Sequence, residues 1–138
     1  MTAPLLSVRG LGKHFPVYGR GFIRKVTGLV RAVDDLNFDL APGETLGLVG
    51  ESGSGKTTAA RCILRALTPT AGSVIFQPAG AAAVDLAKLP EHALKPLRPR
   101  MQMIFQDPIS SLNPRMTVGQ IVAEPLVIHR LAKGAELD

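Results

Sequence analysis

The sequence predicts an α/β fold built around a glycine-rich loop. Three features of the 138-residue chain support this prediction. Residues 50–58 read Gly-Glu-Ser-Gly-Ser-Gly-Lys-Thr-Thr and match the pattern G-x-x-x-x-G-K-[ST] in full. The apolar run 45–49 comes directly before this loop and predicts a buried parallel strand. Residues 57–67 follow it with apolar side chains at helical spacing, which predicts an α-helix that opens at the loop.

The residue types in this loop suit the phosphates of a nucleoside triphosphate. Gly50, Gly53 and Gly55 let the backbone turn tightly, so that successive N–H groups can converge on phosphate oxygens. Lys56 is placed to reach the β- and γ-phosphates as a point charge, and the Thr57 hydroxyl is placed to bind Mg²⁺. The positive end of the helix dipole favours the same anion. The alternative is a chance glycine-rich turn, which the flanking strand and helix patterns disfavour.

Other elements follow from local patterns. Before the loop, residues 5–9 form a candidate edge strand, residues 36–40 alternate as a second strand, and residues 41–44 have the composition of a turn. After the loop, Pro69 and Gly72 end the helix at about Leu67. Further along, the sequence predicts a strand at 73–76, a short helix at 90–94, a strand at 101–105, and a helix after the N-cap Thr117 that Pro125 interrupts.

The composition of the chain argues against several classes of protein. No apolar run has the length of a membrane span, and the N-terminal residues lack the apolar region of a signal peptide. The single cysteine, Cys62, is expected in the core and leaves no internal disulfide. The formal net charge is +5, but interleaved aromatic residues are scarce, so no nucleic-acid partner is expected. A solvated surface or contact with an acidic partner is the default for the basic residues.

Two longer stretches carry a resemblance to a known family. Residues 104–108 read Ile-Phe-Gln-Asp-Pro, and residues 111–118 read Ser-Leu-Asn-Pro-Arg-Met-Thr-Val. Gln106 comes just past a predicted strand, about fifty residues after the loop lysine, and resembles the Q-loop glutamine of ATP-binding-cassette (ABC) ATPases. The N-terminal half, with a basic insertion at 18–31, is similar to the oligopeptide, dipeptide and nickel importer branch. The resemblance covers essentially the whole chain.

The resemblance implies a P-loop NTPase core of the ABC ATPase type, with an N-terminal antiparallel β part and the start of the helical subdomain. Residues 1–138 would be the N-terminal portion of one ABC ATPase domain. Within it, residues 1–106 would be the nucleotide-binding core up to the Q-loop, and residues 107–138 the start of the helical subdomain. The fold is therefore expected to be incomplete.

The resemblance also implies the cofactors ATP and Mg²⁺ and the residues that bind them. Phe15 matches the A-loop aromatic residue, whose ring would stack on adenine, and Gln106 would reach Mg²⁺ and the attacking water. Thr57 and Gln106 are thus the implied metal ligands. The Walker A loop supplies the rest of the nucleotide site: Gly50, Glu51, Ser52, Gly53, Ser54, Gly55, Lys56, Thr57 and Thr58. No catalytic residue is assigned.

Several family motifs have no match in this chain. The Walker B aspartate with its catalytic glutamate, the LSGGQ segment and the switch histidine would all come after Asp138 in the family order. Asp85 follows an apolar run, but Leu86 stands where the glutamate would be, and in the family pattern this position is a connecting segment. The chain is therefore expected to be the N-terminal portion of a longer transport-coupled ATPase and to be inactive alone.

The function that the resemblance implies is the ATP-binding, energy-coupling subunit of a bacterial importer for peptides or related small solutes. Its partners would be transmembrane permease subunits, a second identical or related ATPase subunit and, indirectly, a solute-binding protein. It would lie at the cytoplasmic face of the inner membrane. Two alternatives remain: another P-loop protein, either a small-molecule kinase or a GTPase, and a non-catalytic remnant that binds nucleotide. A GTPase would need an N-K-x-D motif, which the chain lacks.

Overall fold

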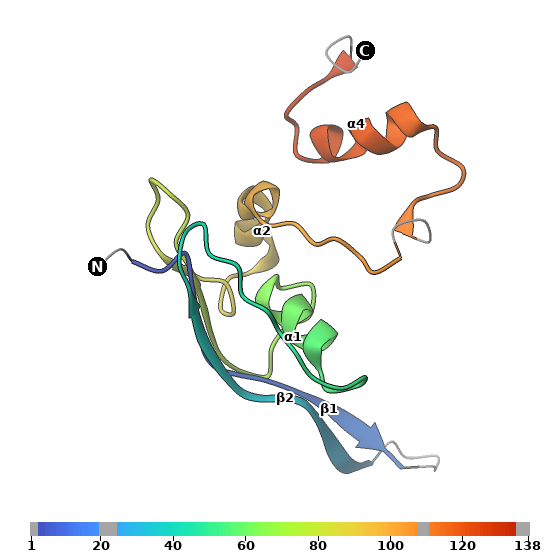
Figure 1. The fold of residues 1–138 in the computed structure, drawn as a ribbon. Coiled ribbons are helices and arrows are strands. Elements are labelled where there is room, and N and C mark those ends of the chain that lie inside the picture. Colours follow the sequence, from blue (N-terminus) through green and yellow to red (C-terminus); the bar gives the residue numbers. More distant parts are fainter. Residues whose placement is uncertain (1–2, 20–24, 108–110, 135–138) are drawn as a thin grey trace. The chain divides into compact units, whose positions relative to one another are not determined.

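The structure is a computed structural model that describes residues 3–19, 25–107 and 111–134. The chain forms two compact units, which meet in sequence between Leu94 and Lys95. The first unit contains an antiparallel sheet and the helices α1 and α2, and the second contains a 3-10 helix and α4 (Figure 1). The predicted subdomain boundary at Gln106 remains a prediction. None of the helices in the described residues has the length and apolarity needed to cross a membrane.

The sheet of the first unit has four strands in the order β2-β1-β3-β4. Its members are β1 (Leu6–Tyr18), β2 (Val26–Leu40), β3 (Ala71–Phe76) and β4 (Val84–Asp85). β1 pairs antiparallel with β2 along one side and with β3 along the other. The strand predicted at residues 5–9 is therefore present, but its prediction as an edge strand is wrong because β3 returns along its second side. The predicted strands at 36–40 and 73–76 are confirmed as parts of β2 and β3.

The helix α1 (Lys56–Ile63) packs on this sheet and completes the core of the first unit. Cys62 is fully buried, which confirms its prediction as a core residue, and Leu94 at the end of α2 (Glu91–Leu94) is buried as well. The predicted short helix at 90–94 is thus confirmed. The buried apolar side chains are Val8, Leu11, Val33, Ala59, Cys62, Val74, Phe76, Leu86 and Leu94.

The helix α1 is shorter than predicted because its last turn closes in a Schellman motif. Arg65 has a left-handed backbone with φ 55°. Its N–H donates to the Cys62 carbonyl at 3.0 Å, and the Ala66 N–H donates to the Arg61 carbonyl at 2.8 Å. The helix therefore ends at Ile63, four residues before the predicted end at about Leu67.

Arginine occupies a position where glycine is common, because its side chain makes hydrogen bonds with a later segment of the chain. The Arg65 guanidinium donates through Nε to the Leu86 carbonyl at 2.8 Å and through Nη2 to the Leu89 carbonyl at 3.0 Å. These hydrogen bonds tie the end of α1 to the chain that follows β4. The left-handed backbone costs about 1–2 kcal/mol, which the hydrogen bonds offset.

Two predicted strands, one of them predicted to be parallel, are absent from the described sheet. Residues 45–49 are extended but belong to no strand, and the Val49 side chain is 92% exposed. Residues 101–105 are likewise outside any strand, and Ile104 is 92% exposed. Both predictions rested on apolar runs, but a strand also needs a neighbour for its backbone groups. No described segment pairs with either run.

The second unit contains the 3-10 helix η1 (Lys95–Arg100) and α4 (Val118–Ile128). Thr117 caps α4 as predicted: its hydroxyl accepts from the Gln120 N–H at 3.3 Å, and the Gln120 side chain accepts from the Thr117 N–H at 2.9 Å. Pro125 lies inside α4 and does not end it, so the predicted interruption is wrong. The helix continues for three residues beyond Pro125 to Ile128.

Candidate functional site

The glycine-rich loop has the conformation that its sequence predicts at the three glycines. Gly50, Gly53 and Gly55 have φ values of 155°, 80° and 90°, in the region that side chains disfavour. The Ser54 N–H donates to the Glu51 carbonyl at 3.2 Å, which closes a turn within the loop. The backbone therefore curls on itself immediately before α1.

The Lys56 side chain folds back across this loop. Its ammonium donates to the Gly50 carbonyl at 2.7 Å, to the Glu51 carbonyl at 2.6 Å and to the Ser54 hydroxyl at 3.3 Å. These three hydrogen bonds hold the positive charge of Lys56 against the loop. An anion that enters the loop therefore meets a cation that is already held in place.

The first turn of α1 adds backbone donors to the same place. Gly55 is the N-cap residue, and no side chain caps the helix. The first N–H groups of a helix have no carbonyl one turn earlier to bind, and the helix dipole makes this end positive. Thr57, in this first turn, is exposed, so its hydroxyl is open to a ligand. Backbone donors, a cation and a hydroxyl thus face one small volume.

The strand β2 positions the loop through a contact that the sequence analysis missed. A Cβ placed on Gly55 would lie 1.9 Å from the Ala32 carbonyl oxygen, so no other residue fits there without moving the backbone. Ala32 is 23 residues earlier in the chain, and nothing in the local sequence around it indicates this contact. Val33 and Ala59, both buried, pack β2 against α1 beside it.

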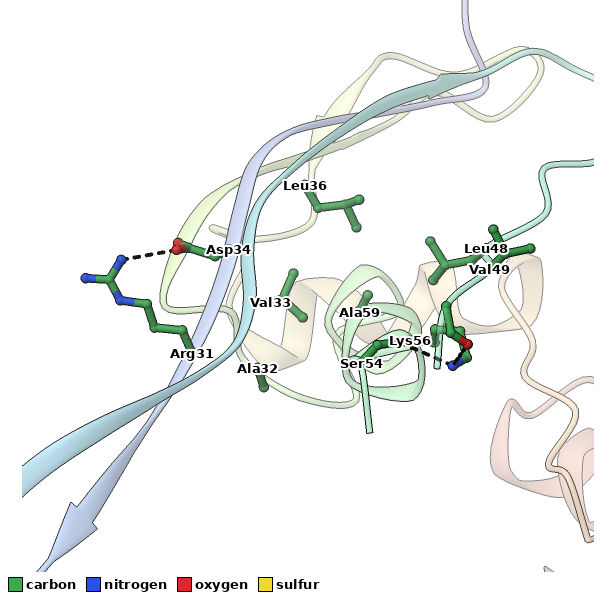
Figure 2. A pocket seen from close by; sticks show the side chains of 12 residues that line it. Arg31, Ala32, Val33, Asp34, Leu36, Leu48, Val49, Ser54, Lys56 and Ala59 are labelled. Carbon is green, nitrogen blue, oxygen red and sulfur yellow. Dashed lines mark hydrogen bonds and ion pairs between the residues drawn. The ribbon is translucent and has the colours of Figure 1, made fainter. Parts of the chain in front are cut away.

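Two shallow clefts meet at the loop. One of about 360 Å³ lies between β2 and residues 48–56, and Figure 2 shows its lining side chains. A second of about 170 Å³ is lined by Ala32 and residues 53–58. Together they expose the loop, Lys56 and Thr57 on one side of the first unit. The donors, the cation and the space fit the phosphates of a nucleotide.

Acidic and basic groups at the rim belong mainly to β2. Asp34 lies 3.1 Å from the Arg31 guanidinium and 3.4 Å from the His14 imidazole. Hydrogen bonds from Arg31 and then His14 lower the pKa of the Asp34 carboxyl. In Figure 2 the Arg31–Asp34 pair points away from Lys56, so it does not neutralise the loop cation.

The other two nucleotide-binding residues predicted from the sequence lie outside these clefts. Phe15 is on β1, partly exposed, with the Lys13 ammonium 5.1 Å from the centre of its ring. It lines neither cleft. Gln106 is exposed in the second unit. The structure therefore brings together the loop residues 50–58 and Ala32, while the assignments of Phe15 and Gln106 stay predictions.

Asp85, the last residue of β4, has a structural role where β4 pairs with β3 and ends. Its Oδ1 accepts from the Val74 N–H at 3.0 Å and from the Ala87 N–H at 3.1 Å, and the Lys88 ammonium lies 3.1 Å from Oδ2. Burial raises the pKa of this carboxyl, but the Val74 N–H, Lys88 and the Ala87 N–H outweigh burial and bring the pKa below its ordinary value. These contacts agree with its interpretation as part of a connecting segment.

Comparison with known proteins identifies the family. The sequence profile described as ABC transporter matches residues 33–137, which cover the glycine-rich loop, α1 and the second unit up to its last residue but one. The chain belongs to the ABC transporter family.

Several curated relatives resemble nearly the whole chain. The Putative peptide import ATP-binding protein of Brucella ovis is 48% identical over 133 residues, which are 96% of this chain and 38% of that protein. The Glutathione import ATP-binding protein of Salmonella paratyphi A is 48% identical over 95% of this chain and 20% of its own length. The chain thus spans about two fifths of the length of the peptide-import relatives.

A solved structure supports the fold. A dimeric ATP-binding cassette in a post-hydrolysis state, bound to ADP and Pi, superposes with a TM-score of 0.72. The alignment covers 95% of this chain and 51% of that chain, at 24% identity. This likeness confirms the ABC ATPase type of fold, including its N-terminal antiparallel β part.

Proposed function

We propose that this chain is the nucleotide-binding, N-terminal portion of an energy-coupling ATPase subunit in a bacterial importer for peptides or related small solutes. The glycine-rich loop carries the proposal, because its backbone, Lys56 and Thr57 present donors, a cation and a hydroxyl to one cleft. The peptide and glutathione importers named among the relatives support the solute class.

In this role the residues of the loop hold MgATP. The backbone N–H groups of residues 50–58 surround the β-phosphate, Lys56 contacts the β- and γ-phosphates, and Thr57 binds Mg²⁺. Phe15 stacks on the adenine ring. Bound Mg²⁺ neutralises charge that develops on the phosphates, while hydrolysis itself needs a carboxylate that polarises water. We infer that this carboxylate belongs to another part of the complete subunit.

Calorimetry of MgATP binding to the 138-residue chain tests the proposal. Lys56→Ala should weaken binding about tenfold to a hundredfold, because charged hydrogen bonds to phosphate contribute about 1.5–3 kcal/mol. Thr57→Ala should weaken binding in the presence of Mg²⁺ but change the affinity for metal-free ATP little. Lys95→Ala, an exposed lysine of the second unit, is the matched control and should bind as the wild type does. Equal affinities for all variants would refute the assignment of the loop.

Gln106 is proposed to link the γ-phosphate to the permease. A residue couples two sites only if its contacts differ between the nucleotide-bound and the free state. In the complete subunit assembled with its permease, Gln106→Ala should leave ATP binding nearly intact and reduce hydrolysis that depends on transport. Gln102→Ala, at a neighbouring exposed glutamine, is the control. Normal transport by the Gln106→Ala variant would contradict this role.

A further inference from the structure

Lys13 lies on the face of β1 that is turned toward the glycine-rich loop. It pairs with Val33 of β2, and residues directly opposite each other in an antiparallel pair point to the same face. The buried Val33 side chain lies toward Ala59 of α1 in Figure 2, and its Cγ2 atom is 3.8 Å from the place that a Cβ on Gly55 would take. The Lys13 side chain is therefore on the side of the sheet where the loop and α1 lie.

The Phe15 ring belongs to the same face of β1. Alternate residues of a strand point to one face, and Phe15 is two residues beyond Lys13. It pairs with Val30, which is two residues from Ala32, the β2 residue in contact with Gly55. Two residues of a strand span about 7 Å, so the ring is within reach of a nucleotide whose phosphates occupy the loop.

The Lys13 ammonium is held between this ring and the chain that follows α1. It donates to the Thr68 carbonyl at 2.8 Å and lies 5.1 Å from the centre of the Phe15 ring. The segment that supplies the carbonyl is itself fixed to β1, because the Thr70 N–H donates to the Gly12 carbonyl at 2.8 Å. The cation thus has a fixed anchor, and its attraction to the π electrons holds the ring beside it.

The Phe15 ring keeps surface that a ligand can cover. A cation lies over only one face of a ring, and the residue is still 38% exposed beside Lys13. Binding a ligand costs free energy whenever a side chain must be immobilised to make the contact. A ring that is already held in one orientation avoids this cost when a flat base stacks on it.

We propose that Lys13 is a positioning residue of the nucleotide site, which holds the Phe15 ring in the orientation that stacks on the purine base. This inference rests on the proposed function, because the base meets the ring only when the phosphates are in the loop. The contact between the ammonium and the ring carries the inference. A lysine that only joined β1 to the chain after α1 would need the hydrogen bond to Thr68 alone.

Ligands with and without a base separate this role from a purely structural one. In calorimetry, Lys13→Met should weaken the binding of MgATP about fivefold, because the base must then order the ring itself. The binding of magnesium tripolyphosphate, which has the phosphates but no base, should not change. Lys13→Arg should bind MgATP nearly as the wild type does, since a guanidinium also lies over aromatic faces. Lys25→Met, at an exposed lysine directly before β2, is the matched control and should bind both ligands normally.

A double variant shows whether Lys13 acts through the ring. Phe15→Leu should weaken MgATP binding about tenfold, because stacking on the base is lost. Adding Lys13→Met to this variant should weaken binding no further, since the two residues act as a unit. Additive losses in the double variant, or an equal loss for both ligands in Lys13→Met, would overturn the positioning role.

Two further outcomes distinguish this inference from the proposed function. If the wild-type chain binds MgATP no more tightly than magnesium tripolyphosphate, the base makes no contact, and the role of Lys13 is wrong while the assignment of the loop stands. If the chain binds neither ligand, the assignment of the loop is refuted and the role of Lys13 falls with it.

Discussion

At the scale of single residues, Asp85 shows how one carboxylate can organise a turn. The Val74 N–H that it accepts from belongs to a fully buried residue of β3. Without this acceptor the N–H would have no partner away from water, which costs about 1–3 kcal/mol. The Lys88 ammonium adds an ion pair to the same carboxylate. Asp85 therefore stabilises the edge of the sheet where β4 joins it.

The lowered pKa of Asp85 makes this contribution dependent on pH. Because the pKa is lower in the folded chain than in the unfolded chain, the contribution is complete above the unfolded value of about 3.8 and is lost as the pH falls through the folded value. Asp85→Asn should lower the free energy of unfolding by about 1–2 kcal/mol at neutral pH and by much less at about pH 3. Urea unfolding at both values measures the difference. Glu124→Gln, at an exposed side chain, is the control. A difference that does not shrink in acid would contradict the ionic role.

Single residues also show how far the candidate site could be predicted. The conformation of Gly50, Gly53 and Gly55 could be predicted because the pattern of the loop is local in sequence. The contact between Gly55 and Ala32 could not, because it joins segments that are distant in the chain. Arg65 was also missed, since its left-handed backbone is compensated by carbonyls more than twenty residues away.

At the scale of secondary-structure elements, the end of α1 depends on Arg65 in two separable ways. Arg65→Gly removes the side-chain hydrogen bonds but suits the left-handed backbone, whereas Arg65→Ala removes the hydrogen bonds and keeps the strain. We expect both variants to be less stable than the wild type, and the alanine variant to be about 1 kcal/mol less stable than the glycine variant. Urea unfolding of the three chains tests this. Equal stability of the two variants would show that the left-handed backbone is not retained in them.

Strands were predicted less reliably than helices from the sequence, for a physical reason. The strand at 36–40 alternates in burial, and its partner β1 is present, so its local pattern and its pairing agree. Residues 45–49 and 101–105 have equally apolar patterns, but no described segment pairs with them. Helices satisfy their backbone groups within one segment, so the helix at 118–128 could form from its local sequence and its capping box.

At the scale of the whole molecule, the chain should bind nucleotide without hydrolysing it. The loop can hold phosphates, but neither Asp34 nor Asp85 presents a free carboxylate to it, because ion pairs and hydrogen bonds occupy both. Positioning alone leaves the attacking water without a base. A phosphate-release assay on the 138-residue chain should therefore show no turnover above background. Turnover that disappears in the Asp85→Asn variant would show that Asp85 serves the reaction after all.

The exposed apolar run at residues 45–49, before the loop, has a consequence for how the chain folds in a cell. Among the described residues, no hydrogen bond joins the backbone of residues 45–49 to another segment, and Leu46, Leu48 and Val49 face water. An extended apolar segment of this kind can pair with the same segment of another copy. Chaperones that bind extended apolar peptides would compete for it as the chain leaves the ribosome. Correct folding therefore depends on whether residues 45–49 bind first to their native neighbour, to a chaperone or to a second copy of the chain.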